Sequence, residues 1–207
     1  MNMDYSLYLV TDESVPTDQL LRVVGEAVEG GVTLVQLREK RSEGKIFYDK
    51  ALKLKQFLKE NYAHIPLIIN DRVDIALAVE ADGVHIGQKD IPVTAVRKIV
   101  PESMIVGVSV SNVTEAKEAA KNGADYLGVG AVYPTTTKDN AEHLPEGMLE
   151  EIAKSVTIPV VAIGGLKVDN LEKVRCENVH GIAVVSGIMH AKNPKEAAGA
   201  YRKSWGA

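Results

Sequence analysis

The sequence predicts an α/β protein that folds as a single (β/α)8 barrel, and three observations favour this class. Short aliphatic runs recur eight times along the chain, and amphipathic stretches separate them. The runs are almost continuously apolar, which is typical of strands in a parallel sheet that is covered by helices on the outside. The length of 207 residues suits one compact domain and lies at the short end of the range for such barrels.

The expected strands share a high content of Val, Ile and Leu and a length of four to six residues. They are Ser6–Thr11, Thr33–Leu37, Pro66–Asn70, Gly83–Ile86, Ile105–Ser109, Tyr126–Val129, Pro159–Ile163 and Gly181–Val185. Helical apolar spacing predicts helices over Thr17–Glu29, Lys45–Glu60, Val113–Asn122, Met148–Lys154 and Lys195–Ser204.

An open, doubly wound sheet is the competing architecture for alternating strands and helices. Weak internal repetition favours the barrel, since Glu80–Gly87 resembles Asn122–Gly130 and both place an Asp just before a strand. No linker or low-complexity tract marks a boundary, so we expect one domain over residues 1–207.

Composition excludes several classes of function. Lys and Arg number 24 and Asp and Glu 28, which gives a formal charge of −4 and argues against nucleic acid or an anionic membrane as a partner. Cys176 is the single cysteine, so neither an internal disulfide nor a cysteine-based zinc site can form. No apolar run approaches the roughly 20 residues of a membrane span, and the N-terminus has no secretory signal pattern. We therefore expect a cytoplasmic protein whose core is built mainly from Val, Ile, Leu and Ala.

The end of the second expected strand carries a cationic cluster. Side chains alternate along a strand, so Gln36, Arg38 and Lys40 share one face while Val35 and Leu37 share the other. Active sites of (β/α)8 barrels lie at the carboxyl ends of the strands. The amide and two cations therefore indicate a site for an anionic ligand, although Lys40 alone could be an ordinary surface charge.

Two carboxylates follow the next two strands. Asp71 comes directly after the third strand and Asp90 shortly after the fourth, where neighbouring strand ends converge. Paired carboxylates without a Cys or His cluster suit Mg²⁺, which commonly takes one or two of them together with substrate phosphates. The structural alternatives are that Asp71 caps a helix beginning near Val73 and that Asp90 closes a turn before Pro92.

Ser109 ends the fifth strand, and His85 lies inside the fourth. We interpret His85 as a hydrogen-bonded core residue. No histidine in a related element is evident as a base for Ser109, so we expect that hydroxyl to bind ligand by hydrogen bonding rather than to act as a nucleophile.

The later strand ends indicate a second anion site. The long polar loop Ala131–Pro145 carries Thr135, Thr136, Thr137 and Lys138, whose hydroxyls and ammonium group suit phosphate, although a solvated connection is the alternative. Gly164–Gly165 follow the seventh strand, and Val185-Ser186 follow the eighth before a short helix. Phosphate sites after strands seven and eight recur in barrels of this type.

Taken in order, these motifs resemble those of the thiamine phosphate synthase family, whose members are also called thiamine-phosphate pyrophosphorylases. The resemblance covers nearly the whole chain and implies a (β/α)8 barrel that joins a hydroxymethylpyrimidine diphosphate to a thiazole phosphate. The motifs that carry it are Tyr8–Asp12, Gln36–Lys40, Asn70-Asp71, His85–Asp90, Gly107–Ser109, Pro134–Lys138, Ile163–Gly165 and Val185-Ser186.

The resemblance implies a role for each candidate residue. The pyrimidine diphosphate would contact Gln36, Arg38, Lys40, Asn70, Ser109 and Lys138, of which Arg38, Lys40, Ser109 and Lys138 would be catalytic. The thiazole phosphate would contact Thr135, Thr136, Thr137, Gly165, Val185 and Ser186, and Asp71 and Asp90 would bind Mg²⁺.

The resemblance and the lack of an evident base together predict a dissociative reaction, in which diphosphate leaves before the thiazole nitrogen attacks. The expected partners are small phosphorylated molecules, and a homo-oligomer is possible. Two other functions stay open: a thiazole tautomerase-like isomerase of the same barrel family, and a phosphate-binding barrel without catalysis.

Overall fold

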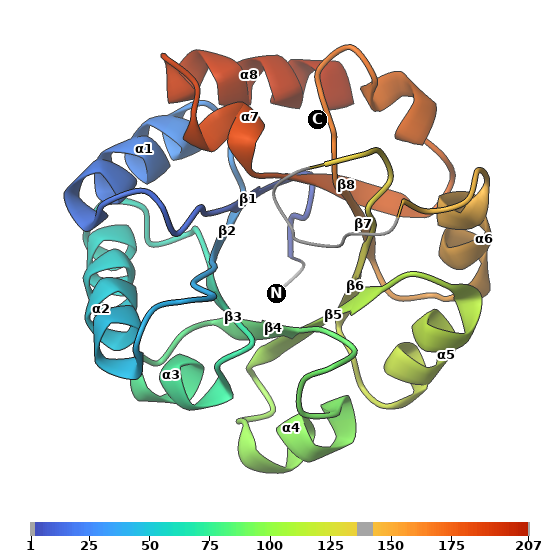
Figure 1. Cartoon of the computed structure of the whole chain (residues 1–207), viewed down its shortest axis with the longest axis horizontal. Coiled ribbons are helices and arrows are strands. Elements are labelled where there is room, and N and C mark those ends of the chain that lie inside the picture. The colour runs from blue at the N-terminus through green and yellow to red at the C-terminus, as the bar shows by residue number, and fades with distance from the viewer. Residues whose placement is uncertain (1–2, 136–142, 207) are drawn as a thin grey trace.

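The chain forms a closed barrel of eight parallel strands surrounded by helices (Figure 1). The computed structural model describes residues 3–135 and 143–206. Each strand pairs with the next in sequence, and β1 pairs in parallel with β8, with Leu7 opposite Ile182. This last pairing closes the sheet and excludes the open alternative. The strands are β1 (Leu7–Val10), β2 (Leu34–Leu37), β3 (Leu67–Asn70), β4 (Gly83–Ile86), β5 (Ile105–Val110), β6 (Tyr126–Val129), β7 (Val160–Ile163) and β8 (Val179–Val184).

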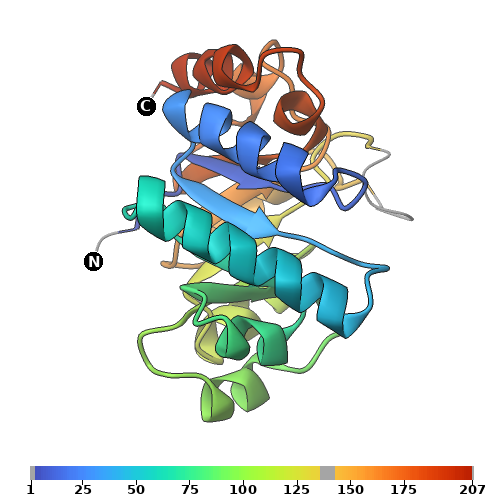
Figure 2. The same cartoon turned by 90° about the vertical axis from the view of Figure 1, so that its left-hand side faces the viewer.

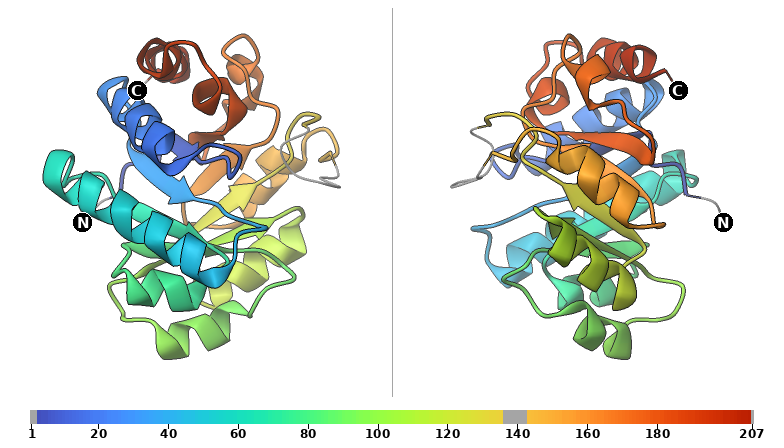
Figure 3. Two further views of the ribbon diagram at one scale, coloured as in Figure 1. Left: turned by 60° about the vertical axis from the view of Figure 1, so that its left-hand side comes forward. Right: turned by 90° about the vertical axis from the view of Figure 1, so that its right-hand side faces the viewer.

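The helices lie on the outside of the barrel (Figure 3). Four of the five predicted helices differ from the observed ones by one residue at one or both ends, and the helix over Thr17–Glu29 agrees at both. The short helices α3, α4 and α7 and the single turn η1 were not delimited from the sequence, because segments of four to seven residues give too little periodicity. The elements are α1 (Thr17–Glu29), α2 (Gly44–Asn61), α3 (Val73–Ala78), α4 (Val93–Ile99), α5 (Val113–Lys121), α6 (Met148–Ser155), η1 (Leu171–Val174), α7 (Ser186–Met189) and α8 (Pro194–Trp205).

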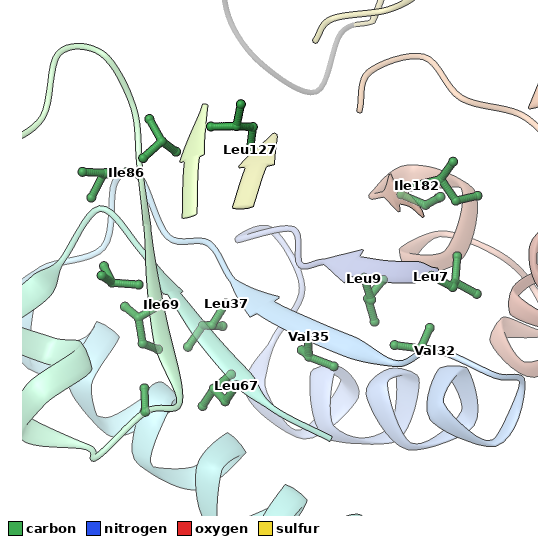
Figure 4. Close-up of a cluster of buried hydrophobic side chains, with 14 of the residues drawn as sticks. Leu7, Leu9, Val32, Val35, Leu37, Leu67, Ile69, Ile86, Leu127 and Ile182 are labelled. Atoms are coloured by element: carbon green, nitrogen blue, oxygen red, sulfur yellow. The ribbon is translucent and has the colours of Figure 1, made fainter. Parts of the chain in front are cut away.

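Hydrophobic packing forms two layers because successive strand residues face opposite sides of the sheet. Leu7, Leu9, Val35 and Leu37 point outward and pack under the helices (Figure 4). The alternate residues point inward and fill the barrel, and they include Tyr8, Val10, Leu34 and Ile68. The outer layer is almost entirely aliphatic, as the composition predicted.

The inner layer differs from that expectation because it contains three aromatic residues. Tyr5, Tyr8 and Tyr126 are at most 7% exposed and lie in contact inside the barrel, with ring centroids of Tyr5 and Tyr126 5.0 Å apart. Three of the seven tyrosines of the chain therefore occupy the barrel interior, where their hydroxyl groups need polar partners.

All strands point the same way, so their carboxyl ends meet at one end of the barrel (Figure 2). The connections that leave these ends form the mouth of the barrel. Across the described residues, none of the helices has the length and apolar character needed to cross a membrane.

Candidate active site

A cavity of about 650 Å³ opens at the mouth of the barrel. Its volume falls in the range typical of small-molecule sites. Residues from every strand end contribute to it, and most of the residues selected from the sequence lie on its walls. Those are Gln36, Arg38, Lys40, Asn70, Asp71, Asp90, Ser109, Thr135, Gly165, Val185 and Ser186.

The end of β2 has the predicted orientation. Gln36 is 4% exposed and lines the cavity, and Arg38 and Lys40 follow it on the same side. Val35 and Leu37 belong to the outer hydrophobic layer, which confirms the alternation. The backbone N–H of Arg38 donates to the Thr11 hydroxyl at 3.0 Å, which fixes the start of the loop beside β1.

A buried ion pair that the sequence does not reveal anchors this loop to α2. The Nζ atom of Lys50 on α2 donates to Oε1 of Glu39 at 2.6 Å and to the carbonyl oxygen of Val15 at 3.1 Å. The side chains of Lys50 and Glu39 are only 7% and 2% exposed. Glu39 lies between Arg38 and Lys40 in sequence, so the pair holds the segment that carries both cations.

Glu13 holds the same loop from the other side. Its Oε2 atom accepts backbone hydrogen bonds from Lys40 at 2.6 Å and Arg41 at 3.0 Å. Burial by itself would raise the pKa of Glu13, but these two donors, with the charges of Arg41 and Arg38, bring it below its ordinary value. Glu13 is therefore a stable anion that orders the backbone of the cationic loop.

Asp71 and Asp90 come together at the mouth, as the sequence predicted. Asp71 has the left-handed backbone angle φ = 60° and forms an ion pair with Lys40. It does not cap α3, whose N-cap residue is Arg72. Asp90 does close its turn, since Oδ2 accepts from the Gly87 N–H at 2.7 Å. Burial and the neighbouring Asp71 carboxylate raise the pKa of Asp90, against the opposing effect of the Gly87 hydrogen bond.

The donor set around these carboxylates fits a hard divalent cation. Within residues 3–135 and 143–206, no group of three or more His, Cys, Asp or Glu side chains is placed to hold a metal ion. Mg²⁺ needs fewer protein ligands, because it retains waters and takes phosphate oxygens from its substrate. Two adjacent carboxylates that repel each other are stabilised by such an ion, so Asp71 and Asp90 fit Mg²⁺ bound together with a phosphorylated ligand.

Asn70 presents a buried polar atom without a partner. Its side chain is 6% exposed, and its Nδ2 atom makes no hydrogen bond to any part of the chain that the structure describes. A buried donor of this kind is costly unless a ligand or water satisfies it. Because Asn70 lines the cavity, its amide is suited to bind an acceptor atom of a ligand.

Ser109 has a histidine partner, contrary to the interpretation of the sequence. The Nε2 atom of His85 lies 2.8 Å from Oγ of Ser109, because β4 and β5 are neighbouring strands and His85 pairs in register with Gly107. The expectation that the two residues belong to unrelated elements was wrong. The other inference about His85 is confirmed, since it is 8% exposed and hydrogen-bonded at both ring nitrogens.

The opposite wall of the mouth is formed by backbone. Gly164 and Gly165 follow β7 with backbone φ angles of 102° and 65°, which residues other than glycine rarely adopt. A Cβ atom on Gly165 would lie 2.6 Å from the carbonyl oxygen of Pro134 and 2.7 Å from Cβ of Tyr133. The glycine is therefore required by the close approach of the β6–α6 connection, in addition to any ligand. Next to it, β8 ends at Val184, and after Val185 the short helix α7 begins at Ser186.

The β6–α6 connection is described only at its two ends. Thr135 lines the cavity, whereas Thr136, Thr137 and Lys138 lie outside the described residues. Tyr133 fixes the first part of the connection, since its N–H donates to the Gly164 carbonyl oxygen at 3.0 Å.

Comparison with known proteins agrees with this geometry. The family model described as "Thiamine monophosphate synthase" matches residues 7–188. A thiamine-phosphate synthase of Methanobrevibacter smithii is 53% identical over 196 residues, which cover 95% of this chain and 93% of that protein. One from Clostridium acetobutylicum is 52% identical over 198 residues, with the same coverage of 95% and 93%.

Solved structures extend the comparison. Thiamine phosphate pyrophosphorylase from Pyrococcus furiosus is 40% identical and superimposes with a TM-score of 0.87, covering 98% of this chain and 96% of that one. A 3-hexulose-6-phosphate synthase matches with a TM-score of 0.73 at 18% identity, over 96% and 99% of the two chains, which shows the shared barrel alone. The chain therefore belongs to the thiamine monophosphate synthase family and is an enzyme of the transferase class.

Proposed function

We propose that the enzyme joins 4-amino-2-methyl-5-hydroxymethylpyrimidine diphosphate to 4-methyl-5-(2-phosphoethyl)thiazole, carboxylated or plain, and releases thiamine phosphate and diphosphate, together with carbon dioxide when the thiazole is carboxylated. The observation that carries this proposal is that cations, converging carboxylates and a glycine turn border one cavity of about 650 Å³. The first alternative, a tautomerase-like isomerase, has no leaving diphosphate to bind. The second, a phosphate-binding barrel without catalysis, is disfavoured because relatives with 53% and 52% sequence identity are thiamine-phosphate synthases.

The diphosphate is assigned to the side of the mouth formed after β2, β3 and β4. Arg38 and Lys40 supply positive charge there, and Asp71 and Asp90 would hold Mg²⁺. When bound, the ion neutralises charge on the leaving diphosphate and orients its oxygens. Lys40 is ion-paired with Asp71, so its ammonium group lies next to the proposed binding position.

The pyrimidine ring is assigned to the floor of the same cavity. The unsatisfied Nδ2 donor of Asn70 supports this assignment, because a ring nitrogen or an ester oxygen of the substrate can accept from it. Gln36 and Ser109 line the cavity beside Asn70 and offer further polar contacts. Asn70, Gln36 and Ser109 can thus satisfy polar atoms of a planar heterocycle bound in the cavity.

The thiazole phosphate is assigned to the opposite side, after β6, β7 and β8. Thr135, Gly165, Val185 and Ser186 line the cavity there, and their backbone N–H groups and hydroxyls suit a phosphate. From the sequence alone, Thr136 and Thr137 are assigned to the thiazole phosphate, and Lys138 of the same loop is assigned to the diphosphate. In this proposal the two phosphorylated groups lie at opposite walls, with their reacting carbon and nitrogen between them.

We infer a dissociative mechanism for the reaction. The exocyclic C–O bond breaks first, its electron pair leaves with diphosphate, and the amino group of the pyrimidine stabilises the resulting methylene cation. The thiazole nitrogen then forms the C–N bond with its own lone pair, so no proton has to be removed. Arg38, Lys40 and Lys138 stabilise the departing charge, an electrostatic contribution worth about 10²-fold or more for one such group.

The overall activity is tested by incubating the purified chain with both substrates and Mg²⁺ and measuring diphosphate and thiamine phosphate. Equal amounts of the two products are expected when both substrates are present, and omission of either substrate is expected to abolish formation of thiamine phosphate. Diphosphate release without thiamine phosphate in the presence of both substrates would contradict the proposed condensation.

The order of bond changes is tested separately. Electron-withdrawing substituents on the pyrimidine destabilise the cation and should slow single-turnover reaction steeply. Because Ser109 is hydrogen-bonded to His85, a covalent route through Ser109 is the alternative, and it predicts a pyrimidinylmethyl adduct when the thiazole substrate is withheld. Absence of rate dependence on the substituent, or detection of that adduct by mass spectrometry, would exclude the dissociative mechanism.

We also propose a cytoplasmic location, with small phosphorylated molecules as the partners. The unpaired thiol of Cys176 supports this location, since it is compatible with a reducing compartment.

A further inference from the structure

A continuous chain of hydrogen bonds crosses the interior of the barrel and ends in the active-site cavity. Nε2 of Gln36 donates to Oη of Tyr8 at 2.7 Å, and Oη of Tyr8 lies 2.8 Å from Oη of Tyr126. Oη of Tyr126 lies 2.9 Å from Nδ1 of His85, and Nε2 of His85 lies 2.8 Å from Oγ of Ser109. The chain thereby joins β2, β1, β6, β4 and β5.

The strands of the barrel leave space for this chain of hydrogen bonds. Tyr8 and Tyr126 are at most 2% exposed, and a Cβ atom on Gly107 would lie 2.1 Å from Cζ of Tyr126. A Cβ atom on Gly128 would lie 3.0 Å from Cε1 of His85. Glycine inside a strand weakens it and often marks a place where another group approaches closely. These two glycines provide the space for the two central rings of the chain.

The direction of the hydrogen bonds follows from the first donor. An amide nitrogen can only donate, so Tyr8 accepts from Gln36, and the proton of the buried Tyr8 hydroxyl is satisfied when it is directed to Tyr126. Tyr126 then donates to Nδ1 of His85, which must carry a lone pair rather than a proton. The neutral imidazole therefore has its proton on Nε2 and donates to Oγ of Ser109. The hydroxyl proton of Ser109 is left to point elsewhere, and Ser109 borders the cavity.

We propose that Tyr8 and Tyr126 are positioning residues that hold His85 in its Nε2-protonated tautomer and thereby aim the hydroxyl proton of Ser109 into the cavity. The chain of hydrogen bonds thus makes the Ser109 hydroxyl a donor toward a bound ligand. The identity of the accepting ligand atom rests on the proposed function, whereas the tautomer does not.

The opposite polarity is the state that the chain excludes. If the three bonds from Tyr8 to Ser109 reversed, Ser109 would donate to His85, His85 through Nδ1 to Tyr126, and Tyr126 to Tyr8. The Ser109 proton would then be unavailable to ligand, and the buried Tyr8 hydroxyl would accept two hydrogen bonds while its own proton had no acceptor within the hydrogen-bonded chain. Burial raises the pKa of both phenols, that of Tyr126 well above its ordinary value, so both remain protonated and able to donate. The difference between the two states is one proton position on His85, which can be observed directly.

The first test uses the unmodified, ligand-free protein. We expect ¹⁵N NMR in mildly alkaline solution to show a protonated Nε2 and an unprotonated Nδ1 for His85, with its signals identified by their loss in His85→Gln. An imidazole that is protonated at Nδ1, or a mixture of the two tautomers in similar amounts, would overturn the proposal. This result does not depend on which reaction the enzyme catalyses.

The second test breaks the chain at its centre. Tyr126→Phe removes the donor to Nδ1, and we expect the Nδ1-protonated tautomer to appear. Tyr5→Phe is the matched control, because the Tyr5 ring packs on Tyr126 with centroids 5.0 Å apart and its hydroxyl forms none of the four bonds. A change of tautomer in Tyr5→Phe as large as that in Tyr126→Phe would show that ring packing, and not the hydrogen bond, sets the tautomer.

The third test asks whether the chain of hydrogen bonds affects catalysis through Ser109. We expect Tyr126→Phe to lower kcat by about tenfold, the size of one hydrogen bond, with KM changed by less than about twofold. In a Ser109→Ala background the same substitution should cost less than about twofold, since the residue on which it acts is missing. An undiminished tenfold loss in that background would show that Tyr126 does not act through Ser109. Failure of the proposed function itself would appear instead as absence of product from the unmodified enzyme.

Discussion

The two sides of the barrel mouth are built on different principles. The cationic wall, formed by Arg38, Lys40, Asp71 and Asp90 after β2, β3 and β4, consists of charged side chains. The glycine wall, formed by Gly164, Gly165 and Ser186 after β7 and β8, consists of backbone in unusual conformations and the start of a short helix. Both sides face the same cavity.

The two walls are held in place by different kinds of interaction with the rest of the fold. The charges of the cationic wall are held by interactions behind it, namely the buried Lys50–Glu39 pair and the Glu13 carboxylate. The glycine wall is held by the close approach of two loops, where a side chain has no room. Substitutions should therefore affect the cationic wall through charge and the glycine wall through space.

The largest expected effect concerns the support of the cationic wall. Lys50→Met leaves the Glu39 carboxylate buried without its partner, which typically costs about 3–5 kcal/mol of folding free energy. Lys45 on the same helix pairs with Asp49 at the surface, with side chains 83% and 50% exposed, so Lys45→Met should leave stability nearly unchanged. Urea unfolding of both variants measures the difference, and equal midpoints would show that the buried pair is not a support.

The next effect concerns the carboxylates of the cationic wall. Asp71→Asn and Asp90→Asn should each lower turnover by about 10²-fold or more and increase the Mg²⁺ concentration needed, because an amide is a weaker ligand than a carboxylate. Asp74→Asn is the control, since Asp74 lies nearby on α3 but pairs with Arg72 at the surface. Steady-state rates over a Mg²⁺ titration provide the measurement. Full activity of either variant at ordinary Mg²⁺ concentration would remove the metal assignment.

A smaller effect separates space from backbone conformation in the glycine wall. Gly147→Ala has to adopt φ near 82° but meets no atom within 4 Å, so we expect a loss of about 1–2 kcal/mol from strain alone. Gly165→Ala has the same kind of strain and also approaches the Pro134 carbonyl oxygen to 2.6 Å, so its loss should be larger. Calorimetry should also show weaker binding of thiazole phosphate to Gly165→Ala only. Equal stability and unchanged binding would contradict the close approach as the reason for the glycine.

The smallest effect concerns the pH dependence of the loop that carries the cations. The folded-state pKa of Glu13 is lowered, so its stabilising contribution is present above the unfolded-state pKa and is lost as pH falls through the folded-state value. Glu13→Gln should therefore be less stable than the parent at neutral pH, and the two should converge in acid. Thermal unfolding across pH measures this, and a constant difference at all pH values would show that ionisation of Glu13 plays no part.

The fold and the cationic wall could be predicted because their signals are local. Each apolar run identifies a strand, and alternation assigns Gln36 and Arg38 to the inner face without knowledge of any other element. The Asp71–Asp90 proximity followed from the rule that neighbouring parallel strands end at the same edge.

The remaining features could not be predicted because they depend on contacts between distant segments. The His85–Ser109 bond needs the register of β4 against β5, and the tyrosine cluster needs the closed barrel. Lys50 has the sequence context of a surface lysine on an amphipathic helix, and only the three-dimensional packing buries it against Glu39. The requirement for Gly165 arises from Tyr133 and Pro134, which lie about thirty positions earlier in the chain.

The most direct test of the account is a crystal structure of the enzyme with thiamine phosphate, diphosphate and Mg²⁺. We predict that diphosphate and the metal ion lie against Arg38, Lys40, Asp71 and Asp90, while the phosphate of the product contacts Gly165 and Ser186. The two phosphorylated groups in exchanged positions, or a metal ion that touches neither Asp71 nor Asp90, would contradict the assignment of the two walls.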